Sequence, residues 1–256
     1  MTLQSFDALL LDVFDLQEQD RIVTFLTAER GKKRGVARGA RRKHSRFAGQ
    51  LQPLSRARVT WFERPASELV RVRSLELSRP ATFLQADLEG LLLGAYLADH
   101  MMEFAQENEA SHELFRLLDT TLEALAAGID RDLAGRYYEI WVLRLAGVFP
   151  SADECLSCGR DLAAHGGVLP ASAEGLLCRR CGGGGLDLEP EIVEFLRRSS
   201  RENLESLAGR PPAAATLAAV AELSARVRRS FLQHELKSFR VIRETLAGLP
   251  PDVSVG

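Results

Sequence analysis

The sequence has no run of apolar residues long enough to cross a membrane. The best candidate, residues 88–102, is interrupted by Glu89, Asp99 and His100, whereas a membrane helix needs about 18 consecutive apolar residues. The first twenty residues carry acidic side chains and no Lys or Arg, so they lack the basic stretch that opens a secretory signal. We therefore expect a cytoplasmic protein without a membrane partner.

The common catalytic motifs are also missing. There is no HExxH, GxSxG, Walker A or dinucleotide-binding pattern. The four glycines at 182–185 are not followed by Lys and Ser or Thr, so they do not form a phosphate loop. The five histidines are scattered along the chain. These features favour a protein that is not an enzyme, although a site assembled from distant residues stays open.

Acidic residues are absent from one segment that is dense in positive charge. Between residues 30 and 46 there are nine basic residues, a density that favours contact with a polyanion such as nucleic acid. A solvated loop and a nuclear localisation signal remain alternatives. The nine residues, called the basic tract below, are Arg30, Lys32, Lys33, Arg34, Arg38, Arg41, Arg42, Lys43 and Arg46.

The charge of the whole chain is divided unevenly. Residues 1–80 contain 16 Lys or Arg against 9 Asp or Glu, a net of +7, and the remaining residues contain 17 against 26, a net of −9. The overall formal charge of −2 therefore hides a basic N-terminal part and an acidic remainder. Such an asymmetry predicts that only the N-terminal part contacts a polyanion.

All four cysteines of the chain fall in one pattern. Cys155 and Cys158 form one CxxC pair, and after nineteen residues Cys178 and Cys181 form another. This spacing predicts one tetrahedral Zn²⁺ per chain, with Gly159 and Gly182 at positions that suit φ > 0. Four thiolates leave no open position for water, so we expect a structural metal that holds an inserted loop. Two disulfides or a thioredoxin-like redox pair are the alternatives.

The hydrophobic pattern divides the chain into a strand-rich part and a helical part. Five strands are expected in residues 1–80, at 8–14, 21–27, 33–39, 59–63 and 69–77. Two of them, 21–27 and 69–77, are rich in β-branched residues and mostly alternate apolar with polar ones, as half-buried strands do. Five short strands suit a Greek-key barrel of the OB type, with the basic tract on the third strand and the loop after it. We expect residues 81–256 to be helical, with the zinc module at about 151–186.

The helical part contains clear apolar stripes at a spacing of three and four residues. One stripe follows Ser111, a residue suited to cap a helix, and a second ends before Gly147 and Pro150. After the paired prolines at 211–212, one long C-terminal helix is expected to place Val220, Leu223, Val227, Phe231 and His234 on one face. The predicted fold class is therefore α+β, with an N-terminal barrel followed by an all-helical domain that carries the zinc module.

Several segments resemble the RecO family of bacterial recombination mediators. The resemblance rests on Gly39-Ala-Arg-Arg-Lys-His-Ser-Arg46 followed by Gly49-Gln-Leu-Gln-Pro53. It continues in Ala95-Tyr-Leu-Ala-Asp99, Glu113-Leu-Phe-Arg-Leu-Leu118, Leu145-Ala-Gly-Val-Phe-Pro150 and Leu236-Lys237-Ser238. In one departure, His44 occupies the position before the signature serine, where the family usually has lysine, and Lys43 lies one place earlier. Some members also lack the cysteines.

The resemblance implies a non-enzymatic DNA-repair protein of the bacterial cytoplasm, associated with the nucleoid. Such a protein binds single- and double-stranded DNA, anneals complementary strands and works with RecR to load RecA onto strands coated by single-stranded-DNA-binding protein. We expect the phosphate contacts to come from Lys32, Lys33, Arg34, Arg38, Arg41, Arg42, Lys43 and Arg46. Phe47, Trp61 and Phe62 are candidates for base stacking, with the barrel core as the alternative for Trp61 or Phe62. An RNA-binding or translation-associated zinc protein and a nuclease are the competing functions.

Overall fold

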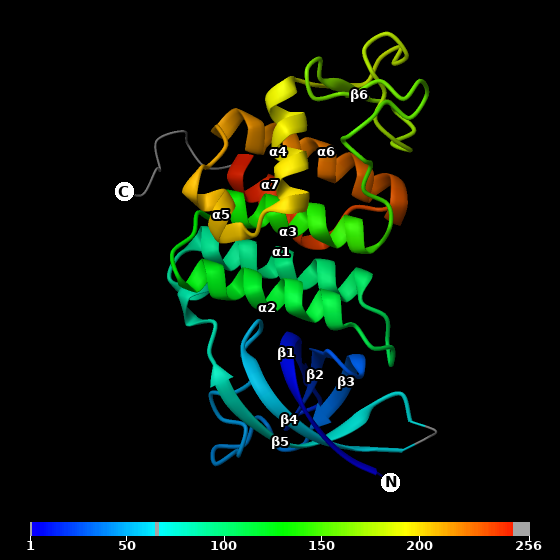
Figure 1. Ribbon diagram of the computed structural model, residues 1–256. Helices are drawn as coiled ribbons and strands as arrows, with labels where there is room; N and C mark the ends of the chain where they lie inside the picture. Colours follow the sequence, from blue (N-terminus) through cyan, green and yellow to red (C-terminus); the bar gives the residue numbers. More distant parts are fainter. Residues whose placement is uncertain (1, 65–66, 248–256) are drawn as a thin grey trace. The chain divides into compact units, whose positions relative to one another are not determined.

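The computed structural model describes residues 2–64 and 67–247 (Figure 1). These residues fall into two compact units. Among the described residues, the first unit comprises those from 2 to 122 together with 236–247, and the second comprises residues 123–235. The first unit contains the expected strands, and the second contains all four cysteines. In the part of the chain that the structure describes, no helix is both long and apolar enough to cross a bilayer.

Five strands of the first unit form a closed barrel (Figure 1). Around the ring the order is β1-β2-β3-β5-β4, with β4 pairing back onto β1. Only β3 and β5 run parallel to each other. This ring confirms the predicted α+β fold with an OB-like N-terminal barrel. The strands are β1 (Thr2–Leu16), β2 (Asp20–Thr27), β3 (Gly31–Ala37), β4 (Arg56–Glu63) and β5 (Val70–Arg79).

The barrel interior is built from the alternating apolar residues of these strands. Trp61 is fully buried, with its ring centroid 5.7 Å from that of Phe6 and 5.3 Å from that of Phe25. Because successive residues of a strand point to opposite faces, its neighbour Phe62 lies on the outer face and is half-buried. Trp61 is therefore a core residue, and Phe62 is not.

Gly31 begins β3 at a place where two backbone segments approach closely. Its φ is +60°, and a Cβ atom there would lie 1.8 Å from the carbonyl oxygen of Glu109. The segment after α1 also forms backbone hydrogen bonds with Lys32, whose N–H donates to Gln106 O (3.1 Å) and whose carbonyl accepts from Asn108 N (3.2 Å). Glycine thus allows the chain at 106–109 to lie against the start of β3.

Helical elements complete the first unit. A 3₁₀ turn, η1 (Thr82–Gln85), precedes α1 (Leu88–Phe104), where the Asp87 carboxylate caps the helix by accepting from Gly90 N at 2.7 Å. The next helix is α2 (His112–Ala126), of which the residues up to Leu122 belong to this unit, and α7 (Lys237–Ala247) packs on α1. Asp99 of α1 accepts hydrogen bonds from both the backbone N–H and the hydroxyl of Ser238, which fixes the start of α7.

The second unit is a helical cluster with a small irregular module. Its helices are α3 (Arg131–Leu145), α4 (Pro190–Arg201), α5 (Leu204–Gly209) and α6 (Ala214–Leu232), and α3 packs on α6. Trp141 donates from Nε1 to the carbonyl of Ser199 at 3.0 Å, which ties α3 to α4. Between α3 and α4 lie the cysteines and a two-stranded sheet of β6 (Gly167–Leu169) and β7 (Leu186–Leu188).

The prediction of one long C-terminal helix after the paired prolines is wrong, because two helices, α6 and α7, occupy that region. Helix α6 ends at Leu232, where Gln233 adopts a left-handed conformation with φ of 62°. Val220, Leu223 and Val227 are buried as expected, but the Phe231 side chain is 49% exposed and His234 is exposed. The apolar spacing continued past the last turn of α6, so spacing alone did not mark the helix end.

Candidate metal centre and nucleic-acid interface

The four cysteines of the second unit meet at one point. Their sulfur atoms all lie within 4.8 Å of one another, and Cys158 Sγ is 3.8 Å from Cys178 Sγ. Zn–S bonds of about 2.3 Å in a tetrahedron would separate the sulfurs by roughly 3.8 Å, whereas a disulfide needs about 2.05 Å. The donor set and its spacing therefore fit a four-thiolate metal site. Two disulfides do not fit this arrangement.

Hydrogen bonds within the cysteine cluster set the acidities of its thiols. Burial disfavours the Cys155 thiolate, but hydrogen bonds from the N–H groups of Cys178, Cys158 and Ser157 lower its pKa to about 6. The N–H of Cys181 likewise lowers the pKa of Cys178. Hydrogen bonds to Cys158 and Cys178 raise the pKa of Cys181 to about 11. Because four adjacent thiolates repel one another, a bound cation is what would stabilise them all in the ionised form.

The two cysteine turns differ at their glycines. Gly159 has φ of +69°, as expected, and its N–H donates to Cys155 O at 2.9 Å. The expectation of positive φ at Gly182 is wrong, although its N–H makes the equivalent bond to Cys178 O at 2.9 Å. A Cβ at Gly182 would lie 3.0 Å from the side chain of Val168. Close packing against β6, not backbone conformation, explains glycine there.

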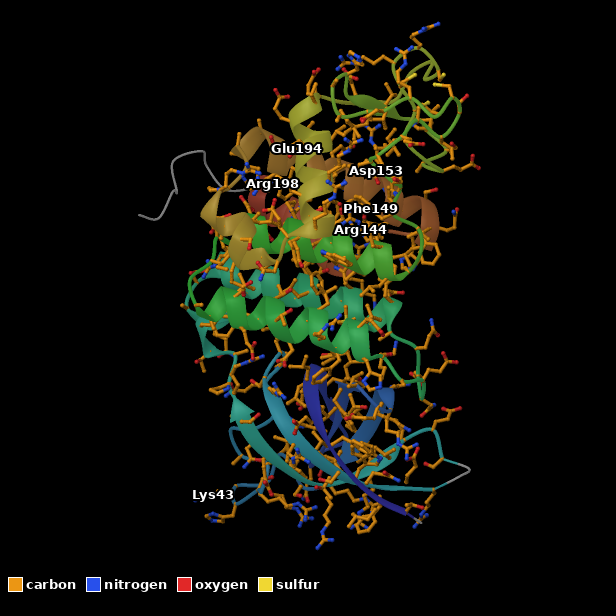
Figure 2. All side chains as sticks on the ribbon, in the orientation of Figure 1. Lys43, Arg144, Phe149, Asp153, Glu194 and Arg198 are labelled. Carbon is orange, nitrogen blue, oxygen red and sulfur yellow. The ribbon has the colours of Figure 1, made fainter. Side chains whose placement is uncertain are left out.

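Most of the basic tract lies on the barrel surface. After β3 the chain makes a series of turns over residues 38–50. Lys43 extends outward from this segment, as Figure 2 shows. The exposed residues of the tract are Arg30, Arg38, Arg41, Arg42, Lys43 and Arg46.

The segment that carries these charges is anchored to the barrel. Ala40, Phe47 and Leu51 are buried members of the barrel core. The N–H of Gly39 donates to the Asp20 carboxylate at 2.8 Å. The five cations of the basic tract from Arg38 to Arg46 therefore extend from a loop with fixed ends.

Two arginines of the loop also contact the end of β1 and the turn that follows it. Arg41 lies 3.4 Å from Asp15, and Arg42 donates to the Gln19 side chain at 2.7 Å. Exposed pairs of this kind contribute at most about 1 kcal/mol. Both guanidinium groups thus remain available to an anionic ligand.

Lys32 and Lys33 are less exposed than most of the other predicted phosphate contacts. Lys33 is 5% exposed, and its Nζ donates to the Glu63 carboxylate at 2.6 Å and to Asn108 Oδ1 at 2.7 Å. The half-buried Lys32 donates from Nζ to the carbonyl of Met102, and burial lowers the pKa of its ammonium. Both lysines thus have protein partners, while the half-buried Arg34 points outward from β3.

Replacing Lys33 by Met is expected to lower the free energy of unfolding by about 2 kcal/mol, because Glu63 would lose its charged partner. The same replacement at Lys43 is the matched control and should change stability by less than about 0.5 kcal/mol. Urea unfolding followed by circular dichroism measures both. Equal stability of the two variants would contradict a supporting role for Lys33.

The same ion pair gives a pH dependence with a defined sign. The Lys33 ammonium holds the pKa of Glu63 below its ordinary value of 4.5. The stabilisation is present above pH 4.5 and is lost as the pH falls through the lowered pKa. The stability difference between the wild-type chain and Lys33→Met should therefore shrink below pH 4.5.

Two arginines outside the predicted set share the outer face of the barrel. Arg71 and Arg73 are exposed on β5, and Arg71 lies beside Val36 of β3 in the parallel pairing. The alternation Val-Arg-Val-Arg at 70–73 could have revealed them, since it places every second residue on the outer face. In the sequence this run predicts a strand, and its two arginines are not among the predicted phosphate contacts.

Known proteins match this chain over most of its length. Residues 1–81 match the family model described as Recombination protein O N terminal, and residues 85–240 match Recombination protein O C terminal. A DNA repair protein RecO of Anaeromyxobacter sp. (strain K) is 34% identical over 94% of each chain. One from Geobacter metallireducens is 33% identical over 75% of this chain and 78% of its own. With both models matched in order, the chain belongs to the recombination protein O family of DNA repair proteins.

Proposed function

We propose that this protein is a DNA-binding recombination mediator and not an enzyme. The observation that carries the proposal is the anchored loop at 38–50, which displays Arg38, Arg41, Arg42, Lys43 and Arg46 together on the barrel surface. Cations on a fixed loop can neutralise phosphates without reading base sequence, as a protein that handles any strand requires. Arg34 on the neighbouring strand completes the proposed contact set.

In this proposal, Lys32 and Lys33 support the surface and do not bind phosphate. Their ammonium groups already have partners within the first unit. We retain an OB-type domain ending near residue 80 and a metal module at about 151–186 as proposals for domain organisation. The metal is proposed to be one structural Zn²⁺ per chain, held by Cys155, Cys158, Cys178 and Cys181.

Membership of the recombination protein O family supports a more specific set of activities on DNA. We propose binding of single- and double-stranded DNA, annealing of complementary strands and, with RecR, loading of RecA onto strands covered by single-stranded-DNA-binding protein. The proposed location is the bacterial cytoplasm, at the nucleoid. The second candidate, RNA binding, is favoured by the same loop, because phosphate contacts do not distinguish the two nucleic acids.

A strand-annealing assay tests the proposal against both alternatives. Complementary labelled DNA strands should anneal faster with the protein, and the effect should weaken as salt rises. If about five cations meet phosphates, log K should fall with log[salt] at a slope of roughly −3.5. Binding that does not respond to salt would contradict the electrostatic account.

Two further arms separate the competing functions. The reaction is repeated with Mg²⁺ or Mn²⁺, where shortening of the strands would indicate a nuclease instead. An RNA competitor of the same sequence is then added to the DNA-binding reaction. RNA that displaces DNA at much lower concentration than unlabelled DNA would favour the RNA-binding alternative.

A further inference from the structure

A row of outward-facing residues crosses four strands of the barrel. Phe62 of β4 is paired with Leu3 of β1 on one side and with Arg71 of β5 on the other. Arg71 is in turn paired with Val36 of β3. Leu3 is 49% exposed and Phe62 is half-buried, so an aromatic ring lies on the surface between an apolar and a cationic neighbour.

A β-bulge in β5 places a second arginine beside the Phe62 ring. Thr60 pairs with Ser74 and Trp61 with Val72, so Arg73 is the extra residue of β5. Its guanidinium carbon lies 5.8 Å from the centroid of the Phe62 ring. Bulges commonly redirect side chains at functional surfaces. Here the bulge gives β5 two exposed arginines, at 71 and 73, next to one aromatic ring.

The arginines of β4 and β5 fall into two groups by their partners. Arg58 pairs with Asp7 at 2.8 Å, and Arg56 and Arg79 both pair with Asp119. Within residues 2–64 and 67–247, Arg71 and Arg73 have no acidic partner in an ion pair. Arg71 and Arg73, beside Phe62, are therefore the arginines of β4 and β5 whose charge no carboxylate of the described residues neutralises. An anionic ligand could supply the missing negative charge.

The row also joins the basic loop. Val36 lies two residues before Arg38, where the loop at 38–50 begins, and both belong to the first unit. An aromatic face accepts any base by stacking, and flanking arginines can hold the phosphates on either side. A paired base inside a duplex has no free face to offer such a ring.

We propose that Phe62, flanked by Arg71 and Arg73, is a stacking site for one unpaired base of single-stranded DNA. The inference rests on the proposed function and adds a device that distinguishes a single strand from a duplex. The loop at 38–50 supplies phosphate contacts common to both forms. Phe62 supplies a contact that only the single strand makes.

The test compares Phe62→Ala with the wild-type chain by fluorescence anisotropy on an oligo-dT strand and on a duplex of the same length. Loss of one stacked base should raise Kd for the single strand roughly 5- to 30-fold. Kd for the duplex should change by less than about 2-fold. Phe62→Tyr should restore the affinity, because its ring keeps a stacking face.

Two controls separate stacking from packing. Phe62→Leu keeps an apolar side chain against Leu3 but has no aromatic face, so it should lose affinity as Phe62→Ala does while preserving stability. Phe14→Ala removes an aromatic side chain from a different strand, β1, where it is 40% exposed. This variant should keep its affinity for both the single strand and the duplex. A strand of abasic sites should bind the wild-type chain and Phe62→Ala equally.

The outcomes distinguish this inference from the proposed function. Failure of the wild-type chain to bind DNA at all would overturn the proposed function and this inference with it. Wild-type binding with unchanged affinity in Phe62→Ala would overturn the stacking site alone. Equal losses of affinity for the single strand and the duplex would also overturn the stacking site. Such a result would indicate that the substitution disturbs the DNA-binding surface as a whole. An equal effect on an RNA strand would overturn the assignment to DNA.

Discussion

Loss of the metal from the four-cysteine centre is expected to unfold the module between α3 and α4. The module has only two strands of three residues each, so it has little regular structure to hold it without the metal. Structural zinc sites in small peptides provide about 10–16 kcal/mol of apparent binding free energy. Cys178→Ser should therefore abolish stoichiometric zinc, which metal analysis should find at one per wild-type chain.

The unfolding should be visible and local. Limited proteolysis should cut Cys178→Ser within residues 151–186 at concentrations of protease that leave the wild-type chain intact. Ser157→Ala, in the same cysteine turn, is the control and should keep its metal. DNA affinity should change by less than about 3-fold, because the proposed contacts lie in the other compact unit. Purified protein with no metal and two disulfides would refute the prediction.

Removing three charges from the basic loop should weaken DNA binding by about 100-fold at 0.1 M salt. The variant is Arg38→Ala, Arg41→Ala and Arg42→Ala combined. Each phosphate contact on a single strand contributes roughly −0.7 to the slope of log K against log[salt], so three contacts give about −2.1. Salt titrations of anisotropy should therefore show a correspondingly shallower slope in the variant.

The matched control removes three exposed arginines from the second unit. Arg160→Ala, Arg180→Ala and Arg201→Ala change the net charge of the chain by the same amount but lie outside the proposed interface. This control should keep both affinity and slope. The loop variant should also keep its unfolding midpoint, since exposed substitutions rarely change stability by more than about 0.5 kcal/mol. Unchanged affinity in the loop variant would move the DNA site elsewhere.

Two strands of the barrel were predictable because they are rich in β-branched residues and mostly alternate apolar with polar ones. Residues 21–27 and 69–77 were found by this pattern, and the structure places β2 and β5 there. The cysteine cluster was predictable for a different reason, because ligand spacing in sequence reflects the geometry of a turn. In both cases the signal lies within a short segment, where local physical chemistry decides the structure.

What sequence reasoning missed depends on contacts between distant segments. The basic run at 32–34 reads as one uniform charge cluster, yet Lys33 is buried because Glu63 and Asn108 lie beside it in the fold. Likewise, Arg71 gains its place next to β3 only through the closure of the barrel. Charge density in the sequence predicts a contact surface, whereas the partners of each cation are set by residues that are remote in sequence.

The fixed ends of the basic loop have a consequence for how this family can vary. Ala40 and Phe47 are both seated in the barrel core, so the number of residues between them is constrained by the distance to be spanned. The identity of most of those residues is not constrained in this way, because all of them except Ser45 are exposed. A cation can then move by one position along the loop without loss of reach. Insertions and deletions should be rare there, and exchanges of one basic residue for another should be common.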